Sequence, residues 1–171
     1  MTCRITSLLL IMLLSLAAAR AEPVSRREVL AAIAVLEGDV TSAAAPQAAV
    51  TVTRFGKESD AVLIILGPET LPWMQEETAG AGATVRAMLM AVYFAGDIKS
   101  QLERNRAEDD PYRGWLAVIK AYRQMRRQQP KLVIPEVEEL IEKEETGRLR
   151  QEAENLRRQQ DPEEPRPTNM A

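Results

Sequence analysis

The chain has 171 residues, with 22 Lys+Arg, 25 Asp+Glu, no His and a single Cys. The lack of His excludes a His-based catalytic triad, a His metal ligand and an imidazole general base. The lone Cys3 excludes an intrachain disulfide and a metal site built from several cysteines. These residue types predict a protein that is not an enzyme, with no catalytic residues, no cofactor and no metal site.

Residues 1–21 have the pattern of a secretory signal peptide. Arg4 precedes an apolar stretch, Ile5–Ala19, and Ala19-Arg20-Ala21 then offers the small residues that signal peptidase reads. The apolar stretch has about 15 residues, fewer than the roughly 20 that a membrane span needs. We predict cleavage after Ala21 and export to a bacterial periplasm or the cell exterior, with no stable membrane span after cleavage. An uncleaved anchor is the alternative.

Cleavage also changes the charge balance. It lowers Lys+Arg from 22 to 20 while Asp+Glu stays at 25, which leaves a net charge of about −5. An exported, acidic chain is a poor partner for nucleic acid, because nucleic-acid binding depends on a basic surface. We therefore predict no nucleic-acid partner.

Residues 22–147 are predicted to form one helical domain. The first helix starts at the capping box Ser25-Arg26-Arg27-Glu28, ahead of apolar residues at helical spacing. A second helix begins near Pro46, and a third runs from about Ala83 to Arg106. The third is apolar nearly all round between residues 87 and 95, which predicts a central helix covered on several sides.

Two further helices complete the predicted domain. Asp110 and Pro111 start the fourth as N-cap and first helical residue. Pro135 opens the fifth, and Gly147 ends or weakens it. Residues 148–160 read as a charged C-terminal helix and residues 161–171 as a disordered tail. The predicted fold class is all-α, with about five helices in a compact bundle or a short stack of helical hairpins.

The apolar run 61–66 is the ambiguous element. Its β-branched residues favour a strand, but the sequence offers no second strand to pair with it. We therefore predict a helix, with a strand as the alternative.

Trp73 and Met74 are candidate partner contacts in the irregular segment 67–82. A loop tryptophan can anchor a partner, although more often it fills the core from the loop. Arg150 and Arg157, on the predicted charged C-terminal helix, are the other candidate contacts.

Other patterns have simpler explanations than chemistry. The Gly-rich segment 78–84 lacks the lysine of a phosphate-binding loop. The adjacent pairs Asp109-Asp110 and Glu76-Glu77 are expected to point apart and to titrate normally. The basic residues between 120 and 131 and the acidic residues between 136 and 145 are expected to neutralise each other across antiparallel helices.

The sequence therefore predicts an exported, non-enzymatic protein-interaction or scaffold module whose partner is another protein. The alternative is a small-ligand carrier or an atypical enzyme, with a pocket between residues 67–82 and the helix 83–106. The partner's identity, the pathway and the oligomeric state stay open.

Overall fold

The structure, a computed structural model, describes residues 22–75 and 82–160. Within these ranges the chain forms α-helices and one short 3-10 helix, with no strand; the elements are α2 (Arg26–Gly38), α3 (Ala45–Glu58), η1 (Pro72–Met74), α4 (Ala83–Arg104), α5 (Pro111–Gln128), α6 (Pro135–Glu145) and α7 (Leu149–Gln160). The all-α prediction is confirmed, and the fold is a compact bundle. The predicted signal peptide and tail lie outside the described residues.

The described part contains six α-helices where about five were expected. Residues 149–160 form a helix of their own, α7, because Gly147, at φ +74°, takes the left-handed conformation and breaks the chain direction after α6. Glycine adopts this conformation without a steric penalty. The interpretation of Gly147 as a helix end is therefore confirmed.

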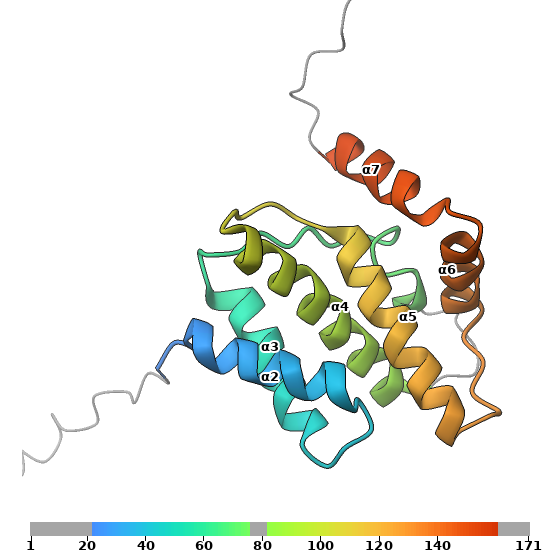
Figure 1. The fold of residues 1–171 in the computed structure, drawn as a ribbon, viewed down its shortest axis with the longest axis horizontal. Helices are drawn as coiled ribbons and strands as arrows, with labels where there is room; N and C mark the ends of the chain where they lie inside the picture. Colours follow the sequence, from blue (N-terminus) through green and yellow to red (C-terminus); the bar gives the residue numbers. More distant parts are fainter. Residues whose placement is uncertain (1–21, 76–81, 161–171) are drawn as a thin grey trace, which may run out of the picture.

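Helix α4 is the centre of the bundle. It packs against α2, α3, α5 and η1 (Figure 1). Half of its length is buried, including the fully covered Leu89, Tyr93 and Ile98. Residues 87–95 of this helix are all apolar and offer no polar face to solvent, and a central position buries most of them.

Helices α4 and α5 approach closely where glycines face the partner helix. A Cβ on Gly96 would lie 2.4 Å from the Arg113 carbonyl oxygen, and a Cβ on Gly114 would lie 2.4 Å from the Tyr93 ring. Both distances are shorter than real contacts allow. These two glycines therefore set the spacing at which α5 presents its residues to the rest of the molecule.

The helix predicted at 61–66 is wrong: this segment forms neither helix nor strand. We call residues 62–66 the strap. Gln101 on α4 accepts a hydrogen bond from the Leu63 N–H (2.9 Å) and donates one to the Leu63 carbonyl (2.6 Å). The Ile65 N–H donates to Asp109 (3.0 Å). Side chains thus satisfy backbone groups that a neighbouring strand would otherwise pair, so the strap needs no strand partner.

Helix α7 belongs to the same core as the rest of the bundle. Leu149, Ala153 and Leu156 lie on one face of this helix and are buried against the body. Figure 1 shows α7 at the edge of the bundle, beyond α6. In the part of the chain that the structure describes, every helix is too short or too polar to cross a bilayer.

Candidate functional site

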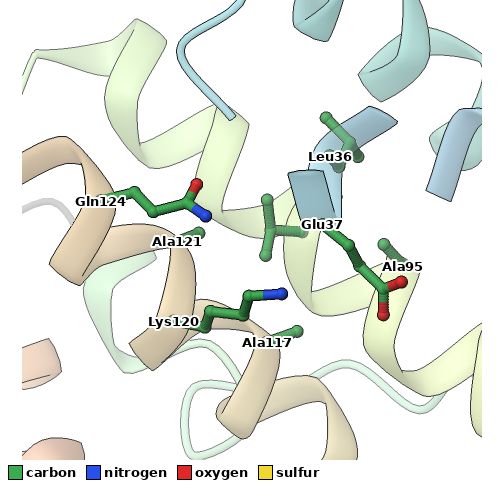
Figure 2. A pocket seen from close by; sticks show the side chains of 8 residues that line it. Leu36, Glu37, Ala95, Ala117, Lys120, Ala121 and Gln124 are labelled. Atoms are coloured by element: carbon green, nitrogen blue, oxygen red, sulfur yellow. The ribbon is translucent and has the colours of Figure 1, made fainter. Parts of the chain in front are cut away.

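A small gap lies between α2, α4 and α5 (Figure 2). Its volume is about 40 Å³, and it is lined by Leu36, Glu37, Val92, Ala95, Ala117, Lys120, Ala121 and Gln124. This volume accommodates a water-sized group and is far below the roughly 300 Å³ of small-ligand sites. We interpret it as a packing gap between helices that meet through alanines.

A second cavity is an open groove of about 440 Å³ along one side of α7, which we call the α7 groove. Its lining comes from α7, from α5 and from the turn before η1; these residues are Glu69, Trp115, Arg148, Gln151, Glu152, Asn155, Leu156 and Gln159. The volume is in the range of ligand sites, but six of the eight lining residues are polar or charged and the groove opens to solvent. Such a groove is better suited to a polar chain than to a small apolar molecule.

Helix α7 is fixed to the body on the flank opposite the groove. The Arg150 guanidinium lies 4.2 Å from the centroid of the Tyr112 ring on α5, a cation–π contact. Arg157 donates to the carboxylate of Glu108, in the loop before α5. Together with the apolar face, these contacts hold α7 in one orientation and leave its other flank free to line the groove.

Three carboxamides line that free flank. Gln151, Asn155 and Gln159 follow one another at intervals of four residues, so they form a row along one side of the helix. We call them the amide row. Asn155 already accepts a hydrogen bond from Arg158 through Oδ1 (2.6 Å), whereas the side chains of Gln151 and Gln159 make no hydrogen bond within the described residues.

The charged residues of the α7 side are paired within the protein. Arg148 forms an ion pair with Glu142 (2.8 Å), and Glu152 accepts from Lys143 (2.7 Å). Desolvation opposes the charge of Lys143, but Glu139 and Glu152 outweigh it and raise the pKa of its ammonium group. The α7 wall therefore presents mainly neutral donors and acceptors to the groove.

The facing wall is a turn that Trp115 holds in place. The indole N–H of Trp115 donates to the Thr70 carbonyl (2.9 Å), and Trp115 is buried beneath the groove. Within the turn, the N–H groups of Thr70 and Leu71 both donate to the Gly67 carbonyl (3.1 Å each). Glu69 projects from this turn, is exposed, and forms no ion pair with any described residue.

A buried carboxyl pair is the other unusual chemical feature. Asp97 on α4 is 0% exposed, and Asp109 in the loop before α5 is 3% exposed. Asp97 accepts hydrogen bonds from Gln101 (2.8 Å) and from the Asp110 N–H (2.8 Å), while Asp109 holds the Ile65 N–H of the strap. The two carboxyl groups interact with each other. They therefore connect α4, the loop and the strap.

Burial raises the pKa of Asp97 to about 8, and the Asp109 carboxyl adds to the rise. Burial also raises the pKa of Asp109. Each group keeps its Oδ2 atom buried without a donor. One proton held between the two carboxyl groups serves both atoms, because it neutralises one group and gives the other a donor.

The expectation that Asp109 titrates normally is therefore wrong, because it did not include Asp97 from the neighbouring helix. The pair is nevertheless inaccessible to a substrate, since both side chains are covered.

Nearby, the Tyr93 hydroxyl is buried and has no hydrogen-bond partner among the described residues. Burial raises the pKa of this hydroxyl most, and the charge of Asp109 raises it further. This cluster supports the position of the strap and does not form an open active site.

The predicted contact residues lie apart from the groove. Trp73 is 0% exposed and packs against Tyr93 with ring centroids 6.4 Å apart, so it fills the core, as the second interpretation expected. Met74 is 39% exposed. Arg150 and Arg157 hold α7 to the body on the flank away from the groove. Sequence analysis missed the amide row, although its four-residue spacing was visible in residues 151–159.

Other sequence expectations are settled in part. Arg123 pairs with Glu144 and Glu145 (3.2 Å each), and Arg126 pairs with Glu138 (2.6 Å), which confirms neutralisation between α5 and α6. No group of three or more acidic, His or Cys side chains among the described residues has the arrangement of a metal site. Glu76, Glu77 and most of the Gly-rich segment lie outside the described residues.

Comparison with family models, with curated proteins and with solved structures finds no match to this chain. A proposal about function therefore depends on the residues and their geometry alone.

Proposed function

We propose that this chain is an exported, non-enzymatic protein-interaction module that binds a partner protein in the α7 groove. The observation that carries the proposal is the amide row, which lines an open groove while the charged side chains beside it are engaged within the protein. Neutral carboxamides at a solvent-exposed surface are free to hydrogen-bond a partner without first breaking an internal ion pair.

Two further observations support this function over an enzyme or a carrier. The chain has no His, and the Asp97–Asp109 carboxyl pair, which has raised pKa values, is covered. A general acid or base must reach the substrate within hydrogen-bond distance, which a covered group does not do. The α7 groove has α7 and Trp115 as walls besides Glu69, so it differs from the pocket expected between residues 67–82 and the helix 83–106, of which residues 76–81 lie outside the described residues.

The test is crosslinking and purification of the tagged protein from the cells that produce it, in three forms. The wild type is compared with Q151A/Q159A, which removes two free carboxamides, and with E154A, a matched exposed change on α7 outside the groove. Circular dichroism confirms that all three are equally helical. Mass spectrometry then identifies each co-purifying protein and its yield.

A stoichiometric partner that the wild type and E154A retain, and that Q151A/Q159A loses, is the expected result. Equal retention by all three forms would contradict binding in the groove. Recovery of the folded protein without any partner would contradict the interaction-module function and favour the small-ligand alternative.

A further inference from the structure

Within the protein, one helix-borne carboxamide, that of Gln101, already binds the backbone of another segment, the strap. The Gln101 side chain donates to the carbonyl and accepts from the N–H of one residue, Leu63, in a segment without regular structure. The next backbone N–H that faces the same side belongs to Ile65, two residues further on. A helix-borne carboxamide therefore pairs with both backbone groups of one residue in a segment outside helix and strand.

The spacing of the amide row matches an extended chain. Residues four apart on an α-helix are separated by about 6 Å along the axis. Every second residue of an extended chain points its N–H and C=O to the same side, at intervals of about 6.6 Å. Gln151, Asn155 and Gln159 can therefore meet alternate residues of one extended segment that runs along α7.

A helical partner would not use this row in the same way. The backbone N–H and C=O groups inside a helix are already paired within the helix. A helical partner usually binds through an apolar stripe in an apolar groove. In the α7 groove the apolar residues Trp115 and Leu156 are buried, and the side chains above them are polar.

The charge in the groove selects the partner's side chains. Arg148 is paired with Glu142, and Glu152 is paired with Lys143. Glu69 is the charged residue of the groove that has no ion pair among the described residues. A carboxylate on the facing wall attracts Lys or Arg and repels an acidic or phosphorylated segment. The groove therefore favours a basic side chain opposite the amide row.

We infer that the α7 groove binds an extended segment of a partner protein, whose alternate backbone groups pair with the amide row and whose Lys or Arg side chain faces Glu69. This inference rests on the proposed function, because it specifies the occupant of the same groove. Gln151 and Gln159 lie eight residues apart, about 12 Å along the axis, which an extended segment of about five residues spans. A heptapeptide is therefore long enough as a probe.

The experiment selects random heptapeptides from a display library on the purified protein. The selected peptides are synthesised, and their Kd values are measured by fluorescence anisotropy. We expect Lys or Arg at a fixed position. We also expect binding to weaken by about tenfold in Q151A/Q159A, as the loss of one or two hydrogen bonds predicts, and to stay unchanged in E154A. E69K should raise the Kd by about two- to fivefold, because an exposed ion pair contributes a free energy of that order to binding.

Backbone N-methylation of the peptide separates the binding mode from the function. Each methyl group removes one N–H donor, so methylation at alternate positions should weaken binding and methylation at the intervening positions should not. If Q151A/Q159A weakens binding but the methylation pattern does not alternate, the extended mode is wrong and the proposed function stands. If E69K leaves binding unchanged, the basic contact is wrong. If no selected peptide distinguishes the wild type from Q151A/Q159A, both the mode and the function are wrong.

Discussion

Asp97 shows how one side chain makes stability depend on pH. In the folded chain its carboxyl group keeps a proton up to a pH of about 8. In the unfolded chain an aspartate releases its proton near pH 4, at about its reference value. Between these values the folded state binds more protons than the unfolded state. The free energy of unfolding therefore decreases as pH rises from about 4 to about 8, and the contribution of this group is constant above that range.

We expect the change Asp97→Asn to reduce this dependence. The amide keeps an oxygen for the Gln101 and Asp110 donors, provides an N–H toward Asp109, and carries no charge to bury. Thermal melts between pH 5 and 9 should show a smaller loss of Tm for the variant, and a higher Tm than the wild type at pH 9. Asp60→Asn, at an exposed position, is the control and should keep the wild-type slope. Equal slopes in D97N and the wild type would show that the pair does not hold a proton.

At the scale of elements, the strap depends on side chains more than on its own sequence. Val62 is buried, and Ile64 packs against the core, where its Cδ1 lies 2.9 Å from a Cβ built on Gly56. The exposed Leu63 and Leu66 contribute less to burial, at 49% and 50% exposure. The position of the strap is therefore set jointly by two apolar contacts and by hydrogen bonds from Gln101 and Asp109.

We expect Gln101→Ala to release the strap locally. The change leaves the Leu63 N–H and carbonyl without their partners and the Asp97 carboxyl without one donor, a cost of about 2–4 kcal/mol for groups of this kind. In the variant, hydrogen exchange followed by NMR should be faster than in the wild type at the Leu63 and Ile65 amides. Exchange at the amides of α2 should keep its wild-type rate. Glu103→Ala, on the exposed side of the same helix, should leave the strap unchanged. Uniformly faster exchange across all helices would indicate global destabilisation and contradict a local role.

For the whole molecule, α7 closes one side of the core and also forms one wall of the groove. Its three buried apolar residues cover part of the body, and its two flanks hold different contacts. A helix rich in charge thus contributes to stability through a narrow apolar face, and the flank that carries the amide row is open for recognition.

We expect removal of α7 to destabilise the bundle without unfolding it. A chain ending at Glu145 loses the burial of Leu149, Ala153 and Leu156, roughly 4 kcal/mol at about 2 kcal/mol for each leucine. Urea denaturation should show a lower midpoint than for a chain that ends at Gln160. An unchanged midpoint would mean that α7 does not pack on the body in solution.

Much of the fold was determined by local sequence. The capping box at Ser25, the Asp110-Pro111 start of α5 and the end of a helix near Gly147 are all observed as predicted, because each depends on residues within one turn of the chain. The central position of α4 also followed from its own sequence, because residues 87–95 are apolar nearly all round and have to be covered by other elements.

The tertiary structure decided the remaining features. The conformation of residues 62–66 could not be predicted from the neighbouring sequence, because their hydrogen-bond partners, Gln101 and Asp109, lie about 40 residues further along the chain. The raised pKa values of Asp97 and Asp109 required the two groups to be buried together, and the groove required α7 to dock beside the Thr70 turn. Sequence periodicity specifies which side of a helix is apolar. The packing of the helices then determines which distant groups are brought together on that side.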